Sequence, residues 1–286
     1  MGLVSATCFA ALGHNVTCID VNKSKISSLK NGNSPFFEEG LSKLIIKYQN
    51  NGNLRFSDSY KNLGNINIFF LCVDTPNYKN GKPNLSSIYK AVRSLAKNIS
   101  QDVVVVIKST VPIGTSKKIQ KYFDKLLILK NIKVDLCSNP EFLREGSSVK
   151  DFMKPDRVIF GTNSKNAGRL LKKLYQPLKI PNSRIIYMSI ESAELTKYAS
   201  NSFLATKISF INEISQLADK SGANIHDIKK GMGKDPRIGN LFLNAGLGFG
   251  GSCFPKDLKA LENSQKSLNL SSGIISETIS VNKRQL

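Results

Sequence analysis

The chain has 286 residues, 41% of them hydrophobic and 22% charged, which is typical of a globular protein of about two domains and excludes a disordered chain. Its longest apolar runs, residues 66–73 and 103–107, are far shorter than the roughly 18 residues of a membrane span, so we expect no membrane segment. The net charge of +20 comes from scattered lysines, never more than two adjacent, which favours a diffusely basic surface over a nucleic-acid partner.

Strand-like and helix-like segments alternate over the first two thirds of the chain, which predicts an α/β fold with a mostly parallel, Rossmann-like sheet. In chain order we expect a helix at 2–12 ended by Gly13, a strand at 15–20, a helix from about residue 22, a strand at 66–73, a helix at 86–98, and strands at 103–109, 133–138, 157–161 and 184–188. The strands from residue 66 to 161 are short apolar runs bounded by turn residues, as expected of strands covered on both faces.

The pattern becomes helical after the last of these strands. Leu204, Ile208 and Ile211 have helical spacing within a long helix at 192–217. A helix at 223–230, a glycine-rich loop and a helix opened by Pro255 follow. We therefore predict a boundary near residue 188, between a Rossmann-like domain at 1–188 and an all-helical central domain at 189–286.

The beginning of the Rossmann-like domain differs from a complete dinucleotide fold. Such a fold starts with a strand and G-x-G-x-x-G, whereas this chain starts where that motif would finish, with Gly2 in the place of the third glycine. We therefore expect the sheet to lack its first strand. Asp20 ends the next strand, where a carboxylate accepts hydrogen bonds from the adenosine ribose and so favours NAD over NADP. An ordinary turn or cap residue is the alternative.

Polar loops follow three of the later strands. They begin at Asp74-Thr75-Pro76, at Ser109-Thr110 and at Asn139-Pro140-Glu141. Because ligands of open α/β sheets bind outside the carboxyl ends of the strands, we expect these loops to face one crevice. Ordinary turns and helix caps are the alternative for each loop taken singly.

In the helical part, Glu194, Lys197 and Asn201 share one face of the long helix, either as functional groups or as a solvated polar stripe. The strongest signal is the run GLGFGGSCFPKD. Its glycines allow a ligand to approach the backbone closely, and Cys253 precedes a helix whose N-terminal dipole favours a thiolate. Asp257, four residues on, can share a helical face with that thiol. A flexible loop with an incidental cysteine is the alternative.

Five cysteines form an odd set without a CxxC or Cys/His metal spacing, so we expect no metal site and a reducing, cytoplasmic location. Cys8, Cys18, Cys72 and Cys137 stand in apolar segments and are expected to be buried and unreactive. Cys253 is the exception because it stands in the glycine-rich loop.

These stretches together resemble the UDP-glucose 6-dehydrogenases of the UDP-glucose/GDP-mannose dehydrogenase family. The matching segments are GHNVTCIDVN, STVPIGT, NPEFLREGSSVKDFMKPDRVIFG, ELTKYASNSFLATKISFINEI and DPRIGNLFLNAGLGFGGSCFPKD. The resemblance implies oxidation of UDP-glucose to UDP-glucuronate in two NAD-dependent steps. It also implies a homodimer or higher homo-oligomer through the central helix.

The resemblance implies that Cys253 is the nucleophile, forming first a thiohemiacetal and then a thioester. Lys197 would stabilise the developing oxyanion, and Asp257, with a water held by Thr110, Glu141 and Asn201, would handle protons. The cofactor-binding residues implied are Asp20, Lys25, Thr75, Thr110 and Glu145. The substrate-binding residues implied are Phe142, Leu143, Glu145, Lys197, Asn201, Phe249 and Gly250, with Arg237 reaching the substrate of a neighbouring subunit.

The chain also departs from the family pattern. The first strand, the first two phosphate-loop glycines and the C-terminal UDP-binding domain are expected to be absent. Glu39 stands where the family commonly has Pro, and Asp74 where Gly or Pro is usual. Two alternatives therefore stay open: a truncated, non-catalytic chain or partner subunit of a full-length dehydrogenase, and a dehydrogenase of another UDP-sugar.

Overall fold

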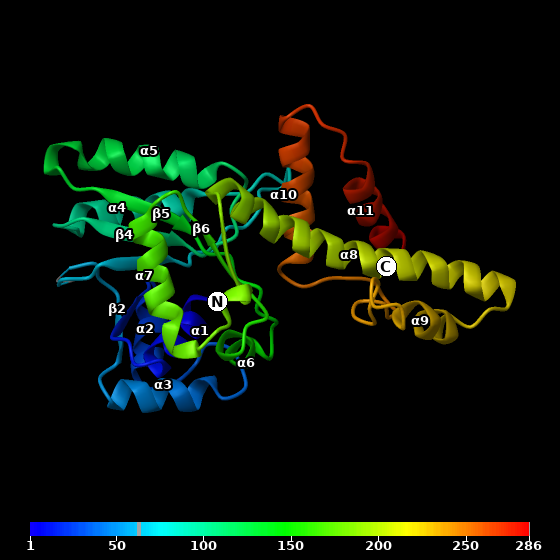
Figure 1. Cartoon of the computed structure of the whole chain (residues 1–286), viewed down its shortest axis with the longest axis horizontal. Coiled ribbons are helices and arrows are strands. Elements are labelled where there is room, and N and C mark those ends of the chain that lie inside the picture. The colour runs from blue at the N-terminus through cyan, green and yellow to red at the C-terminus, as the bar shows by residue number, and fades with distance from the viewer. Residues whose placement is uncertain (62–63, 286) are drawn as a thin grey trace. The chain divides into compact units, whose positions relative to one another are not determined.

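A computed structural model describes residues 1–61 and 64–285 of the chain. The chain divides into two compact units (Figure 1). The first unit comprises residues 1–75 and 85–194, and the second comprises residues 76–84 and 195–286, of which residue 286 lies outside the described residues.

The first unit alternates strands and helices along the chain. Its strands are β1 (Val16–Ile19), β2 (Leu54–Ser57), β3 (Ile68–Leu71), β4 (Val103–Ile107), β5 (Val134–Ser138), β6 (Val158–Gly161) and β7 (Ile185–Met188). Its helices are α1 (Gly2–Ala11), α2 (Lys23–Lys30), α3 (Leu41–Asn50), α4 (Ser86–Asn98), α5 (Thr115–Leu127), α6 (Ser148–Met153) and α7 (Lys165–Tyr175), with short 3₁₀ turns at Ile128–Lys130, Gln176–Leu178 and Asn182–Arg184. The helix α8 (Ile190–Ser221) continues into the second unit, which adds α9 (Ile225–Gly233), α10 (Phe254–Ser267) and α11 (Gly273–Gln285).

The predicted fold class is confirmed: a mostly parallel α/β part is followed by a helical part. The described strands nevertheless form two sheets, β1–β2 and β3–β4–β5–β6–β7. All pairs are parallel except β5 and β6, which are antiparallel and joined through Ser138 and Gly161. Within the larger sheet, β6 and β7 therefore run in the direction opposite to β3, β4 and β5.

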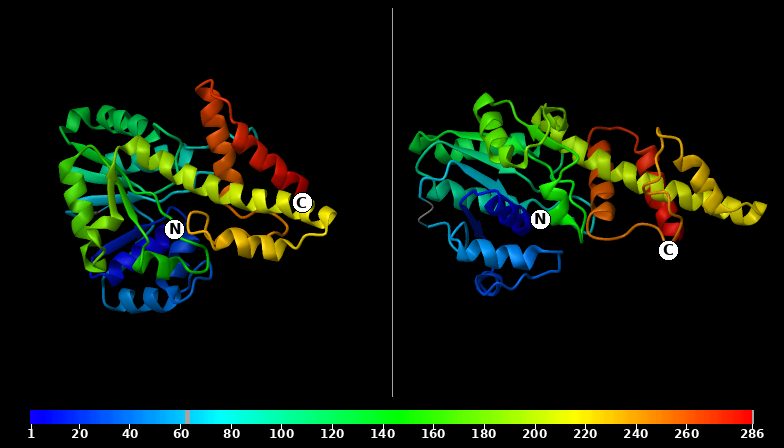
Figure 2. Two further views of the ribbon diagram at one scale, coloured as in Figure 1. Left: turned by 45° about the vertical axis from the view of Figure 1, so that its right-hand side comes forward. Right: turned by 60° about the horizontal axis from the view of Figure 1, so that its bottom comes forward.

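Helices cover both faces of the larger sheet (Figures 1 and 2). Successive side chains of β4 point to opposite faces: Val104 and Val106 join the core with α1, α6 and α7, while Val105 joins the core with α4 and α5. Phe9 of α1 is central to the first core, with ring centroids 5.0 Å from Phe152 and 5.3 Å from Phe70. The continuous apolar run of β4 thus reflects burial on two sides.

The predicted elements are all present, with ends shifted by a few residues. Six further elements were not among those predictions: β2, α3, α5, α6, α7 and α11. The strand β2 is four residues long and only alternately buried, so its apolar signal is weak. The helices α5 and α7 are rich in lysine, and their few apolar side chains become informative only when packed against the sheet.

The described part of the chain includes no helix both long enough and apolar enough to cross a membrane.

Candidate active site

The glycine-rich loop of the second unit presents Cys253 at the start of α10. Cys253 is the N-cap residue of that helix, Pro255 occupies its first turn, and the Cys253 carbonyl accepts a hydrogen bond from the Asp257 N–H at 2.8 Å. The Cys253 side chain is exposed, and its Sγ lies 3.6 Å from the Ser252 hydroxyl. The thiol is therefore accessible to solvent at the N-terminal, positive end of a helix.

Asp257 lies one turn further along α10 and is buried, with 1% of its surface exposed. One carboxylate oxygen accepts a hydrogen bond from the Asn201 side-chain amide at 2.6 Å, and the other accepts from the Lys256 ammonium at 2.6 Å. Both oxygens of this buried carboxylate are therefore satisfied. The structure brings two predicted site residues, Asn201 and Asp257, into direct contact.

The polar face of α8 is buried. Glu194, Lys197 and Asn201 are all less than 9% exposed, so the solvated-stripe alternative is wrong. Within the first unit, Glu194 accepts hydrogen bonds from the Gly114 N–H, the Ser116 N–H and the Ser116 hydroxyl, at 2.6 to 2.8 Å. Burial raises the pKa of Glu194, although these bonds act in the opposite direction. Glu194 thereby caps the N-terminus of α5.

Asn282 of α11 holds the loop that precedes Cys253. Its side chain accepts from the Phe249 N–H at 2.7 Å and donates to the Phe249 carbonyl at 2.9 Å. Gly248 has a positive φ of 95°, and a Cβ there would lie 2.4 Å from the Asn282 Oδ1, so only glycine fits. Phe249 packs edge-on against Phe254, whereas Gly250 is exposed.

A short hairpin at residues 76–84 also packs on α10. The Asn77 amide donates to the Lys256 carbonyl at 2.9 Å, and Gly81 lies against the side chains of Lys259 and Asn263. Sequence reasoning missed Asn77 and Asn282 because their partners are distant in sequence, and it missed Lys256 although its partner Asp257 is the next residue. Arg237 is exposed and forms a bidentate pair with Asp235.

In the first unit, Asp20 follows β1 and pairs with Lys25 at 2.5 Å. Asp20 also accepts the Asn22 N–H at 3.0 Å, and the Asn22 side chain caps α2. Burial by itself would raise the pKa of Asp20, but the bonds from Lys25 and Asn22 outweigh it and hold the pKa below its usual value. The strand end therefore carries an ionised carboxylate.

The loops after β3 and β4 contact each other directly. The Thr75 hydroxyl donates to the Thr110 carbonyl at 2.8 Å, and the Ser109 hydroxyl donates to the Val73 carbonyl at 2.6 Å. Thr75 is buried and Thr110 is half-buried. These bonds confirm that the parallel strands bring the two loops to one edge of the sheet.

The loop after β5 is ordered by carboxylates. Glu141 accepts from the Leu143 N–H at 2.7 Å, and the Phe142 ring lies 3.8 Å from the Arg157 guanidinium. Leu143 packs against the first core, whereas Glu145 is exposed. The next residues of the loop are held by Glu38, which accepts from the Gly146 N–H, the Ser148 N–H and the Ser148 hydroxyl.

A buried lysine supports the same loop. Lys108 follows β4, and its ammonium donates to the Asn139 side-chain oxygen at 3.1 Å, an oxygen that also accepts from the Tyr175 hydroxyl at 2.7 Å. Burial lowers the pKa of Lys108, which Cys72 and Glu141 only partly counteract. Sequence reasoning missed this network because Lys108 continues an apolar strand and Tyr175 belongs to a helix 36 residues after Asn139.

The predicted site residues therefore fall into two groups. The first unit contains two contacting pairs, Thr75 with Thr110 and Asp20 with Lys25, and it also carries residues 141–145. Asn201 with Asp257 are in contact within the second unit, which also carries Lys197, Arg237, Phe249, Gly250 and Cys253. Within residues 1–61 and 64–285, no cluster of three His, Cys, Asp or Glu residues is suited to a metal ion.

The five thiols are all free but differ in environment. Cys8 and Cys137 are buried, Cys18 and Cys72 are half-buried, and Cys253 is exposed. Burial raises the pKa of Cys8 and of Cys18 to about 12 and that of Cys137 to about 11, and it also raises the pKa of Cys72. The predicted burial is confirmed for Cys8 and Cys137 and is only partial for Cys18 and Cys72, and the reactivity of Cys253 stays a prediction.

We expect iodoacetamide at pH 8 to alkylate Cys253 at least about tenfold faster than any other cysteine, because the thiolate is the reactive form and the other four thiols are poorly ionised. Peptide mass spectrometry over a time course measures each rate. In guanidinium chloride the five rates should converge. Faster labelling of Cys18 or Cys72 than of Cys253 in the folded chain would contradict this prediction.

Comparison with known proteins gives a consistent result over both units. The family model of the UDP-glucose/GDP-mannose dehydrogenase NAD binding domain matches residues 1–179, and that of the central domain matches residues 191–284. The chain is 44% identical to the UDP-glucose 6-dehydrogenase YwqF of Bacillus subtilis over 286 residues, which cover all of this chain and 64% of that protein. It thus spans about two thirds of the length of the curated relatives it matches.

Two solved structures of sugar-nucleotide dehydrogenases are similar to this chain. A UDP-glucose dehydrogenase from Pyrobaculum islandicum has a TM-score of 0.93 at 37% identity, covering 99% of this chain and 66% of that one. A UDP-D-ManNAc dehydrogenase from Pyrococcus horikoshii has a TM-score of 0.89 at 27% identity, with the same coverage. Both similarities extend over nearly the whole chain.

Proposed function

Because the chain belongs to the UDP-glucose/GDP-mannose dehydrogenase family, we propose that it acts in the NAD-dependent oxidation of UDP-glucose to UDP-glucuronate. The observation that carries this proposal is the arrangement around α10: an exposed thiol at the helix start, one turn from a buried carboxylate that is bonded to Asn201 and Lys256. The Cys253 thiol, the fixed Asp257 carboxylate and the buried Lys197 are suited to covalent catalysis and proton transfer in the oxidation of an alcohol to an acid.

The residues of the first unit fit NAD. Asp20 is an ionised acceptor at the carboxyl end of β1, suited to the ribose hydroxyls, and Lys25 holds it in place. We propose that Asp20, Lys25, Thr75, Thr110 and Glu145 hold the dinucleotide. When bound, NAD supplies the acceptor for one hydride in each of the two oxidations.

The chain's own residues would act at the C6 carbon of the sugar. Cys253 Sγ adds to the C6 aldehyde, and the carbonyl oxygen takes a proton to give a thiohemiacetal. Loss of hydride from C6 and of the hydroxyl proton leaves a thioester. Water attacks this thioester to release the carboxylate and restore the thiol. Lys197 would stabilise negative charge on oxygen at each addition, and Asp257 would take protons.

The remaining predicted residues have supporting roles in this proposal. Thr110, Glu141 and Asn201 would hold the water, since each offers a polar atom on a loop or helix that hydrogen bonds order. Phe142, Leu143, Phe249 and Gly250 would line the sugar nucleotide. Arg237 would reach the substrate of a neighbouring subunit.

The function is tested by NADH formation from NAD with UDP-glucose, UDP-N-acetylmannosamine and GDP-mannose in parallel. We expect two NADH per UDP-glucose consumed, with UDP-glucuronate as product. Preference for another sugar nucleotide would retain the chemistry and overturn the substrate assignment. The absence of NADH with all three would contradict the enzymatic proposal and favour a non-catalytic chain or a partner subunit.

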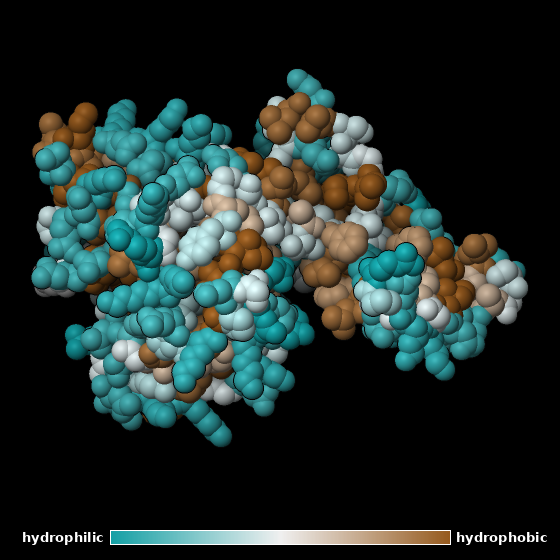
Figure 3. Space-filling view, viewed as in Figure 1, coloured by the Kyte–Doolittle hydropathy of each residue, from teal (hydrophilic) through white to brown (hydrophobic). Residues whose placement is uncertain are grey.

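We further propose that α8 pairs with a second copy of this chain. Leu195, Phe203, Phe210 and Leu217 are 42% to 66% exposed and recur at intervals of seven or eight residues, which gives one apolar stripe along a 32-residue helix. Figure 3 shows apolar side chains at the surface over the second half of α8. A self-complementary stripe of this length suits a twofold pairing of identical helices.

Phe203→Glu with Phe210→Glu should convert the dimer to a monomer, because the charges would be buried in the paired stripe. Sedimentation velocity over a range of concentrations measures the change. Asp219→Lys is the matched control, since this exposed residue is about 200° around the helix from Leu217. A monomeric unmodified chain, or a double variant that still dimerises, would contradict this pairing.

A further inference from the structure

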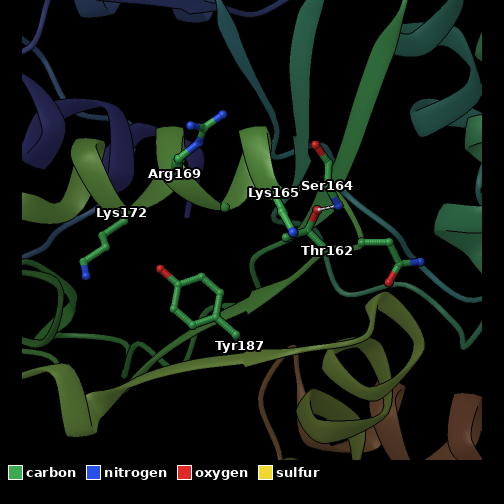
Figure 4. A pocket seen from close by; sticks show the side chains of 8 residues that line it. Thr162, Ser164, Lys165, Arg169, Lys172 and Tyr187 are labelled. Carbon is green, nitrogen blue, oxygen red and sulfur yellow. Dashed lines mark hydrogen bonds between the residues drawn. The ribbon is translucent and has the colours of Figure 1, made fainter.

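A pocket of about 540 Å³ lies between helix α7 and strand β7 of the first unit (Figure 4). This volume is within the range of small-molecule sites, about 300 to 1,000 Å³. The pocket is lined by Gly168, by Asn163 and by the six residues labelled in Figure 4. None of these residues has a part in the function proposed above.

The pocket carries a concentration of uncompensated positive charge. Lys165, Arg169 and Lys172 are spaced four and three residues apart on α7, within an arc of roughly 60°. Within residues 1–61 and 64–285, none of the three side chains takes part in a hydrogen bond or an ion pair. The N-terminal, positive end of the α7 dipole adds to the positive electrostatic potential that these three side chains produce.

One carboxylate stands near the pocket and is already engaged. Asp135 accepts the Ser164 hydroxyl at 2.7 Å and pairs with the Lys133 ammonium at 3.3 Å. It therefore leaves the charges of Lys165 and Lys172 available to a ligand.

One side of the pocket is formed by the aromatic ring of Tyr187. Tyr187 is 52% exposed and packs edge-on against Phe160, with centroids 5.5 Å apart. Gly168 lies against the Tyr187 ring, because a Cβ at this position would be in van der Waals contact with it at 3.4 Å. Figure 4 shows the Lys172 side chain beside the Tyr187 hydroxyl, Lys165 near Thr162, and Arg169 extending to the other side of α7.

The lining of the pocket includes no residue of the loops after β3, β4 and β5. Because β6 runs antiparallel to β5, the chain leaving β6 returns toward the start of β5, where the Thr162 hydroxyl donates to the Leu136 carbonyl at 3.3 Å. The pocket is therefore lined by the segment after β6, by α7 and by β7, and its lining does not include Asn139 or Glu141.

We propose that this pocket binds an organic phosphate of nucleotide size. Its ring would pack against Tyr187, and its phosphate would be bound by Lys165 and Lys172. Arg169 would contribute to the attractive field without direct contact. This site is independent of the dehydrogenase function proposed above.

Lysine footprinting of the unmodified chain tests the proposal. With uridine 5′-monophosphate present, we expect acetylation of Lys165 and Lys172 to slow at least about threefold, since a bound phosphate shields both amines. Lys173 is the internal control, because it is adjacent to Lys172 and does not line the pocket. Equal rates with and without the nucleotide, or equal slowing of Lys173, would overturn the proposal.

The chain has no tryptophan, so Tyr187→Trp places a single fluorescent reporter in the pocket. Uridine 5′-monophosphate should change its emission, and adding Lys165→Glu with Lys172→Glu should weaken binding at least about tenfold, while Lys173→Glu should leave it unchanged. Binding of pyrophosphate as tight as that of the nucleotide would show an anion surface without ring recognition and overturn the proposed ligand class. All these readouts are independent of dehydrogenase activity.

Discussion

Replacement of Cys253 by alanine is expected to lower NADH formation from UDP-glucose at least about 10³-fold, since it removes the thiol proposed to form the covalent intermediate. Serine at this position should be nearly as inactive, because an alkoxide is much harder to form than a thiolate. Cys253 is exposed, so the free energy of unfolding should change by less than about 0.5 kcal/mol. The loss of NADH formation is therefore expected to come from the missing thiol and not from unfolding of the chain.

Initial rates of NADH formation and urea unfolding curves, measured on the same preparations, separate these two effects. Cys137→Ala is the matched control, because it removes a buried thiol that has no proposed role. That variant should retain turnover and lose some stability. Turnover by Cys253→Ala within about tenfold of the unmodified chain would contradict the assignment of the nucleophile.

Replacement of Asp257 by asparagine is expected to reduce turnover about 10²-fold or more and to lower the free energy of unfolding by about 1 to 3 kcal/mol. The carboxylate accepts from Asn201 on one oxygen and from Lys256 on the other. An asparagine side chain offers one oxygen, so its amide N–H₂ must face one of these two donors. The buried donor left without an acceptor accounts for the loss of stability.

Glu262→Gln is the matched control on the same helix. Its carboxylate pairs with Lys266 near the surface, and such pairs contribute about 0 to 1 kcal/mol. Steady-state kinetics and urea unfolding of both variants provide the comparison. If Asp257→Asn lost stability but kept its turnover, the carboxylate would be structural and the proton-handling role would be wrong.

Local patterns predicted the parts of the site that are continuous in sequence. The glycine-rich run identified the Cys253 loop, and the spacing of Cys253 and Asp257 placed them one helical turn apart, as the structure shows. The helical spacing on α8 likewise grouped Lys197 with Asn201. Such patterns are readable because helix periodicity relates residues three to seven positions apart.

The α/β class, the order of the main elements and the candidate site residues could be predicted from the amino-acid sequence, because apolar periodicity and turn residues are local properties. The partners of those residues became known from the tertiary structure: Glu194 for the N-terminus of α5, Asn282 for the Phe249 loop, and Asn139 for Lys108. The antiparallel orientation of β6 relative to β5 likewise comes from the tertiary structure, since an apolar run in the sequence does not specify how the strand is oriented against its neighbour. Hydrogen-bond partners and pockets arise where distant segments meet, and sequence spacing does not encode that meeting.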